Sequence, residues 1–325
     1  MLERTLPGLV LVLAGGPLSA WSAGRARPAR LRSWTVVLNE DDGDPQAAGP
    51  ISWRRALAHV AGSASGPPVQ AGLSVTVHFH PDRVVGEVPL LQHLVADGLY
   101  RSQFETGTSN GGLTAHPGGD RWRWEQRMFA GTYDDAPPDR RPKYGSLNHR
   151  GRPAGGSVRF GSSHLRLRPH VLERTTFCYP DSVTEPTAVG TAAHMSLIAL
   201  AEADEVDVLD DYIEAQVHGP LPLDRDIEAL VLDPSYRGTE IEATAAALPF
   251  PVIWHHGFRL HVDVLAENGE YRGEEVVRAG RAVAEGDWLD ARTIGDASRS
   301  GRHAPQILKR LWHCTARFGY AWPGR

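Results

Sequence analysis

Strand-like and helix-like segments follow one another at irregular intervals along this chain. Alternation of apolar and polar residues with a period of two predicts a half-buried strand, whereas apolar residues three or four positions apart predict an amphipathic helix. The strands that we expect span residues 73–80, 99–104, 157–168, 175–178, 211–218, 226–232, 251–254 and 258–262. The helices that we expect span residues 52–60, 88–96, 121–129, 192–203, 236–248, 274–285 and 305–318, and residues 134–156 are predicted to be mostly irregular. This mixture favours the α+β class over a succession of βαβ units.

The chain is long enough and apolar enough to bury a sizeable core, because 41% of its 325 residues are hydrophobic. Residues 39–50 (NEDDGDPQAAGP) are polar and rich in turn formers, so they are predicted to be a linker. We therefore expect a leader or linker over residues 1–50, a main domain over residues 51–265, and a helical C-terminal extension over residues 266–325 that packs on the core.

The first 23 residues have the outline of a signal peptide, with Arg4, an apolar run and small residues near Ala20. The segment GRARPARLR follows at once, and positive charge just past an apolar run opposes translocation. These features leave the localisation open, with the cytoplasm favoured over secretion. The apolar run is also too short and too interrupted by Gly and Pro to span a membrane, so we expect no membrane partner.

Charge and cysteine content exclude some classes of function. The formal net charge is −5 and no long basic stripe occurs, so binding to nucleic acid through release of counterions has little support. Cys178 and Cys314 are the only cysteines, and they lack CxxC spacing. Neither a disulfide framework nor a cysteine zinc site is therefore indicated.

Three separated segments carry the residues best suited to catalysis or ligand binding. They are LYRSQFETGTSNGG (99–112), ERTTFCYPDS (173–182) and YIEAQVHGPLPL (212–223). They offer a guanidinium, a pair of hydroxyls beside an aromatic ring, and a carboxylate. An arginine can hold phosphate or ribose oxygens in a bidentate fork, and a carboxylate can stabilise an oxocarbenium-like transition state. Such groups suit a substrate with phosphates, a ribose and a cationic aromatic leaving group.

The carboxylate belongs to Glu214, at the centre of an otherwise apolar alternating strand. Tyr212, Glu214 and Gln216 share one face of that strand, and three apolar residues form the other. The polar row must therefore face either water or a site.

In this order, the three segments resemble the arginine, serine-threonine-serine and glutamate motifs of bacterial mono-ADP-ribosyltransferases of the cholera-toxin-like type. They also resemble those of related transferase domains in phage-head and polymorphic toxins. A strand with tyrosine and arginine precedes a double glycine in that family, and Arg101 with Gly111 and Gly112 looks like this pattern. The family's catalytic glutamate lies five residues before a glycine, as Glu214 lies before Gly219.

Thr175 and Thr176 stand where the family has its serine-threonine pair, with Phe177 as an aromatic neighbour. The resemblance spans about 125 residues and implies an ADP-ribosyltransferase-like split β-sandwich core with flanking helices. It implies NAD as substrate, cleavage of the nicotinamide-ribose bond, transfer of ADP-ribose to an unknown acceptor or to water, and no need for a metal. The site residues that it implies are Glu214 and Arg101 as catalytic, and Arg101, Thr175, Thr176, Phe177, Gln216 and His80 as NAD-binding.

One departure from the family concerns the acceptor. Arginine-modifying members carry a second Glu or Gln two residues before the catalytic glutamate, and this chain has Tyr212 there. The resemblance therefore favours another acceptor, or hydrolysis of NAD, over arginine. From about Ser52 onward the chain also resembles a family of uncharacterised bacterial proteins.

Two alternatives stay open. His78 and His80 lie on one face at the end of a predicted strand, an arrangement that can bind a divalent metal in a hydrolase. Further ligands could come from His149, His164, His218, His255 or His256. No HExxH motif occurs, and the eightfold alternation of a barrel is missing. The other alternative is a module that binds NAD without consuming it.

Overall fold

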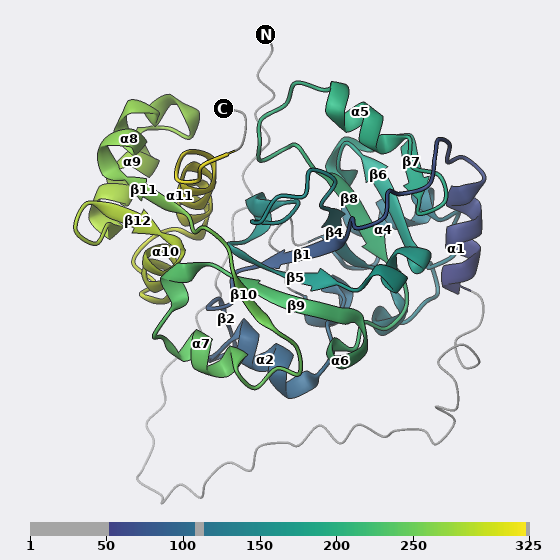
Figure 1. Cartoon of the computed structure of the whole chain (residues 1–325), viewed down its shortest axis with the longest axis horizontal. Coiled ribbons are helices and arrows are strands. Elements are labelled where there is room, and N and C mark those ends of the chain that lie inside the picture. Colours follow the sequence, from purple (N-terminus) through teal and green to yellow (C-terminus); the bar gives the residue numbers. More distant parts are fainter. Residues whose placement is uncertain (1–51, 108–113, 323–325) are drawn as a thin grey trace, which may run out of the picture. The chain divides into compact units, whose positions relative to one another are not determined.

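The computed structural model describes residues 52–107 and 114–322 (Figure 1). The predicted leader, the linker and the Gly111 and Gly112 pair therefore lie outside the described residues. The described part is a mixed α+β protein, as the sequence predicts, and it is built on one large, mostly antiparallel sheet. Among the described residues, no helix is long and apolar enough to cross a bilayer.

The sheet has eight strands, and its spatial order differs from the chain order. In space the strands are β10 (Val252–Trp254), β9 (Ile227–Leu232), β5 (Ser163–Leu167), β1 (Val75–Phe79), β4 (Lys143–Leu147), β8 (Ile213–Val217), β6 (Thr175–Tyr179) and β7 (Ala188–Thr191). Every neighbouring pair is antiparallel except β9 and β10, which are parallel. Two small hairpins complete the strands: β2 (Val84–Val85) with β3 (Val88–Pro89), and β11 (Arg259–His261) with β12 (Trp288–Asp290).

The sheet divides between β1 and β4, its two central strands (Figure 1). These strands pair at only two positions, Val75 with Leu147 and Thr76 with Ser146. Farther along, β1 stays paired with β5, and β4 stays paired with β8. The sheet therefore consists of two four-stranded halves, β10-β9-β5-β1 and β4-β8-β6-β7, that are joined at one end of the β1–β4 pair.

Strand alternation gives the sheet one apolar and one polar face. Ile213, Ala215 and Val217 belong to the main hydrophobic core, and the opposite face of β8 carries Glu214 and Gln216. This polar face is also covered, because a smaller cluster with residues of α1 and α4 packs over Cys178 of β6. The polar row of the sequence is consequently buried.

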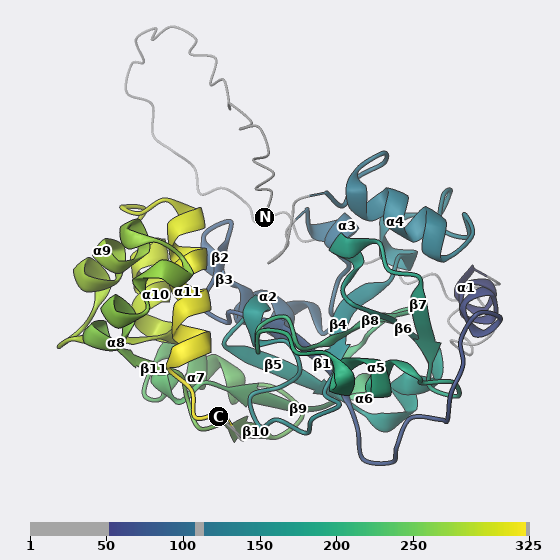
Figure 2. The same cartoon turned by 90° about the horizontal axis from the view of Figure 1, so that it is seen from above.

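Helices surround the sheet. They are α1 (Ser52–Ala61), α2 (Leu90–Asp97), α3 (Gln103–Thr106), α4 (Asp120–Met128), α5 (Leu197–Ala203), α6 (Leu223–Asp226), α7 (Glu240–Ala245), α8 (Val262–Glu267), α9 (Glu274–Val283), α10 (Ala291–Arg299) and α11 (Pro305–Phe318). Short 3₁₀ helices occur at Pro138–Arg140, Val158–Phe160, Pro169–Arg174, Ser182–Thr184, Pro234–Tyr236 and Gly269–Tyr271. Figure 2 shows α8 to α11 gathered on one side of the molecule and α1 at the other.

The C-terminal helices share the main core with the sheet. Leu308 and Leu311 of α11 belong to the same cluster as Val77 of β1. In addition, the indole of Trp312 donates a hydrogen bond of 3.0 Å to the carbonyl oxygen of Val158. Residues 266–325 therefore do not form a separate core in the part that the structure describes.

Two sequence predictions for local structure are wrong. Residues 99–104 do not form a strand, because Ser102 and Glu105 make a reciprocal capping box that starts α3. Residues 134–156 are not mostly irregular, because they contain β4 in the middle of the sheet. The β4 sequence KYGSL has little strand propensity, and its pairing with β1 and β8 outweighs that local preference.

Candidate functional site

A cavity of about 180 Å³ opens where the two halves of the sheet diverge. His78 and Phe79 of β1 line one side of it, and Tyr144 and Gly145 of β4 line the other. Glu214, on the neighbouring strand β8, contributes a buried carboxylate. Helix α2 and the residues after it form a further wall that contains Arg101. The cavity therefore combines aromatic rings, guanidinium groups and one buried acid.

Side chains and a backbone amide hold the Glu214 carboxylate in one orientation. The Ser182 backbone N–H and hydroxyl donate to Oε2 at 3.2 and 2.8 Å. The Gln216 Nε2 donates to Oε1 at 3.1 Å, and the Arg121 Nη1 lies 3.4 Å from the same oxygen. Because Glu214 is only 7% exposed, these protein donors replace most of the water that a strand carboxylate would have.

A chain of buried hydrogen bonds fixes the amide of Gln216. The Thr176 hydroxyl donates to the Gln216 Oε1 at 3.0 Å and lies 3.0 Å from the Nε2 of His218. The other ring nitrogen of His218, Nδ1, lies 2.7 Å from the Tyr133 hydroxyl. Burial lowers the pKa of His218 to about 3, so the ring is neutral, with its proton on Nε2 and Nδ1 as the acceptor. Each bond then runs in one direction, from Tyr133 and His218 toward Glu214.

A second chain of contacts reaches Glu214 through Arg121 of α4. The Arg121 guanidinium lies 3.9 Å from the centre of the Tyr144 ring, and it donates to the Ser182 hydroxyl at 2.7 Å. The Tyr144 hydroxyl donates to Glu125 at 2.9 Å, and Arg141 donates to the same carboxylate at 2.7 Å. Burial raises the pKa of Glu125 to about 7. Two buried acids thus lie on either side of the stacked Arg121 and Tyr144 pair.

Of the residues that the sequence singled out, Arg101 and Glu214 line the same cavity. The Arg101 side chain is 41% exposed and makes ion pairs with Asp97 at 2.8 Å and with Glu105 at 3.3 Å. It therefore lies where the cavity meets solvent. Gln216 and Thr176 are on the Glu214 side of the sheet, and they reach the cavity through Glu214.

Thr175 and Phe177 do not reach the cavity, and their predicted contact with a ligand has to be corrected. Strand alternation points both to the opposite face of β6, because they pair with Val217 and Ala215. The Thr175 hydroxyl donates to the Val171 carbonyl oxygen at 2.7 Å, and Phe177 is fully buried in the main core.

The histidine predictions need a similar correction. His80 is not part of the cavity wall, since its ring packs edge-on against Trp312 with 4.9 Å between ring centres. His78 lines the cavity, but its Nδ1 lies 3.1 Å from the Gly161 carbonyl oxygen, and its Nε2 accepts from the Ser157 N–H at 3.2 Å. Both nitrogens of His78 thus have protein partners. Within residues 52–107 and 114–322, no cluster of three or more His, Cys, Asp or Glu is arranged to hold a metal.

Arg121, Tyr144, Glu125 and Ser182 are the site residues that sequence reasoning missed. Ser182 ends the segment that already contained Thr176, and Tyr144 lies in the strand that was predicted to be irregular. Arg121 and Glu125 are four positions apart and so share a face of α4. That spacing is only a weak signal, since opposite charges four positions apart on a helix usually pair with each other at the surface.

Fold and site together define an α+β protein with a cavity in a divided, mostly antiparallel sheet. A family model described as a protein of unknown function, DUF3626, matches residues 74–206 and 194–317. The chain belongs to this family, whose matched ranges include the sheet, the cavity and most of the C-terminal helices. Comparison with curated proteins finds no match.

Proposed function

We propose that this protein cleaves the nicotinamide-ribose bond of NAD and passes ADP-ribose to an acceptor or to water. The observation that carries the proposal is the Glu214 carboxylate, which is buried, oriented by Ser182 and Gln216, and placed in the cavity wall. Loss of nicotinamide leaves positive charge on the ribose. A fixed carboxylate in a site with little water stabilises such a charge much more than a solvated one does.

The remaining cavity wall supports the same substrate. Arg101 lies where the cavity meets solvent and would bind the phosphates or the ribose, since a guanidinium donates two parallel hydrogen bonds to such oxygens. Tyr100 and Phe160 offer aromatic surface to a flat, cationic ring. Thr176 would act by fixing the Gln216 amide. No metal has a part in this proposal.

The division of the sheet supports the proposed kinship with ADP-ribosyltransferases. The resemblance implies a split β-sandwich core, and the cavity here lies between β1 and β4, where pairing stops after two positions. The acceptor stays undefined. Tyr212 occupies the place of the acceptor-positioning residue, and its hydroxyl donates to Asp181, which leaves arginine a poor candidate.

The test is nicotinamide release from labelled NAD by the purified chain, together with a calorimetric measurement of NAD binding. Glu214→Gln keeps the shape of the side chain and removes its charge. We expect kcat to fall by about 10²- to 10³-fold, while the Kd for NAD stays within about threefold.

Glu228→Gln is the matched control, because Glu228 lies on β9 with a side chain that is 45% exposed and pairs with Arg166. It should keep the activity of the unchanged protein. A wild-type protein that neither binds nor cleaves NAD would contradict the proposal. Binding without release would instead identify a module that has kept the ligand and lost catalysis.

A further inference from the structure

We infer that α10, one of the C-terminal helices, positions the part of the cavity wall that carries Arg83 and Arg101. Arg299 is the positioning residue on α10, and it acts through Asp82. As a statement about NAD binding, this inference rests on the proposed function. As a statement about the cavity wall, it rests on geometry alone. The ion pair joins two residues 217 positions apart, one in the turn after β1 and one at the end of α10.

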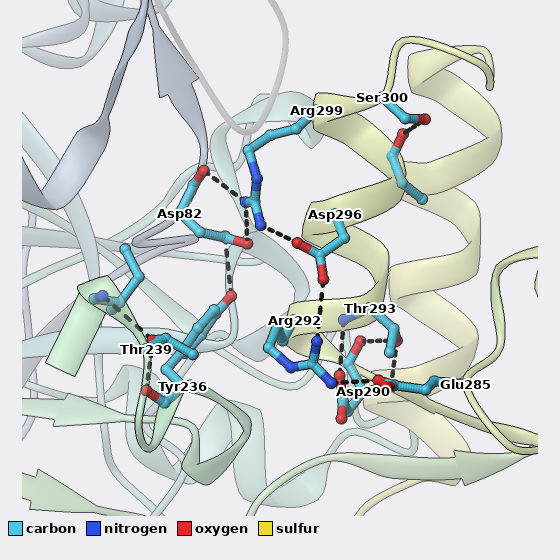
Figure 3. Close-up of polar contacts among 12 residues, drawn as sticks. Asp82, Tyr236, Thr239, Glu285, Asp290, Arg292, Thr293, Asp296, Arg299 and Ser300 are labelled. Atoms are coloured by element: carbon cyan, nitrogen blue, oxygen red, sulfur yellow. Dashed lines mark hydrogen bonds and ion pairs between the residues drawn. The ribbon is translucent and has the colours of Figure 1, made fainter.

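The contact between α10 and this turn is close (Figure 3), with Asp82 buried and the Arg299 side chain 32% exposed. The Arg299 Nη1 donates to the Asp82 Oδ2 at 2.7 Å and to the Asp82 carbonyl oxygen at 3.1 Å. The Tyr236 hydroxyl donates to the other carboxylate oxygen at 3.0 Å. A side chain at Gly295 would overlap the Asp82 carboxylate, so the helix packs directly on it. The 4% exposure of Asp82 leaves these two groups, Arg299 and Tyr236, as its main polar surroundings.

The turn is joined to the cavity wall by its own backbone. Arg83 follows Asp82 directly and lines the cavity. The Leu90 N–H donates to the Arg83 carbonyl oxygen at 2.8 Å, and the Leu91 N–H donates to that of Pro81 at 3.1 Å. The start of α2 is therefore tied to the same turn that Arg299 holds.

Helix α2 carries the connection on to Arg101. Its residues Leu90, His93, Leu94 and Asp97 line the cavity. Asp97, at the end of the helix, accepts from the Arg101 Nε at 2.8 Å. A shift of the turn would therefore displace two of the guanidinium groups in the wall, those of Arg83 and Arg101. Arg121 comes from α4 and is not part of this chain of contacts.

Removal of Arg299 leaves the buried Asp82 carboxylate without its cationic partner. A buried acid in that position either takes up a proton or moves toward water, and both outcomes loosen the turn. Glu214 lies on β8, in the other half of the sheet, and its donors come from β8, α4 and the 3₁₀ helix at Ser182–Thr184, so the reacting geometry should be preserved. Removal of Arg299 should therefore weaken ligand binding without slowing the chemical step.

The experiment compares Arg299→Met with Arg292→Met. Arg292 lies on the same helix and contacts Asp296, as Arg299 does, but its other partner is Glu285 and not Asp82 (Figure 3). We expect Arg299→Met to raise KM and Kd for NAD by roughly 3- to 30-fold, with kcat within about twofold. Arg292→Met should match the wild type, and Arg299→Lys should recover part of the affinity because it restores the charge.

Hydrogen exchange provides a readout that does not depend on NAD. In Arg299→Met, the amides of Leu90 and Leu91 should exchange faster, while those of β8 should keep their protection. Equal exchange in the two variants, with equal affinity, would overturn the inference. Faster exchange throughout, β8 included, would show a purely structural ion pair and would also overturn it. If the wild type fails to bind NAD, the proposed function fails, and the exchange comparison still decides whether Arg299 positions the wall.

Discussion

The Arg121 guanidinium lies 3.4 Å from the Glu214 carboxylate, although 93 residues separate them in the chain. Both side chains are largely buried, and the Ser182 hydroxyl bonds to each of them. Arg121 therefore has two parts in this site: it balances the acid in the free protein, and it holds the serine that orients Glu214.

We expect Arg121→Met to lower kcat/KM for nicotinamide release by about 10- to 100-fold, because Glu214 loses a charged partner and Ser182 loses its donor. Arg123→Met is the matched control, since Arg123 is on the same helix, is 58% exposed and pairs with Asp120 at the surface. Steady-state kinetics measure both variants. Equal activities would show that Arg121 has no influence on Glu214.

Two adjacent threonines on opposite faces of β6 allow a sharp test of the hydrogen-bond chain. Thr176→Val removes the hydroxyl that joins Gln216 and His218, so kcat should fall about tenfold, and the free energy of unfolding should fall by about 1–3 kcal/mol. Thr175→Val removes a bond to the Val171 carbonyl oxygen only. It should lower stability by about 1 kcal/mol and leave kcat unchanged. Urea unfolding and nicotinamide release are the measurements. A comparable loss of kcat in both variants would contradict the role of the hydrogen bonds that connect Thr176 to Glu214 through Gln216.

His218 should make stability depend on pH in a predictable direction. Burial lowers its pKa from 6.5 in the unfolded chain to about 3 in the folded protein, so the unfolded state binds the extra proton between these values. The contribution of neutral His218 is complete above pH 6.5 and shrinks as the pH falls toward 3. The difference in unfolding free energy between the wild type and His218→Gln should therefore decrease by up to ~1.4 kcal/mol per pH unit below pH 6.

Denaturant unfolding of both proteins at pH 7, 6 and 5 checks this expectation. The comparison with His218→Gln cancels the titration of all groups that the two proteins share, including Glu125, whose raised pKa acts in the opposite direction. A difference that stays constant over this range would mean that His218 is protonated, or exposed, in the folded protein.

Local pattern was sufficient for some elements and insufficient for others. Helix α11 has the predicted bounds, Pro305–Phe318, because its apolar stripe and its initial proline are both local signals. Strand β4 was missed because its sequence carries no such signal. The predicted strand at residues 99–104 gave way to α3, because the Ser102 and Glu105 capping box competes with strand pairing.

The candidate site, too, could be predicted only in part from local sequence. Alternation in residues 213–217 alone places Glu214 on the face opposite Ala215, and the structure keeps that arrangement. The sequence also indicated Arg101, which precedes a glycine-rich segment, as a candidate site residue. It could not reveal that Arg101 lies near solvent while Arg121 contacts the acid, since nothing in either local sequence records which partner is near.

The sequence by itself determined the α+β class, the strand that carries Glu214 and the face on which that residue lies, because side-chain periodicity and capping are properties of neighbours in the chain. Only the tertiary structure decided that this polar face is buried, that the sheet divides between β1 and β4, and that Arg121 and Ser182 contact Glu214. The physical reason is that these features depend on strand order and helix packing between segments dozens of residues apart. Their energies arise from contacts that no single segment contains.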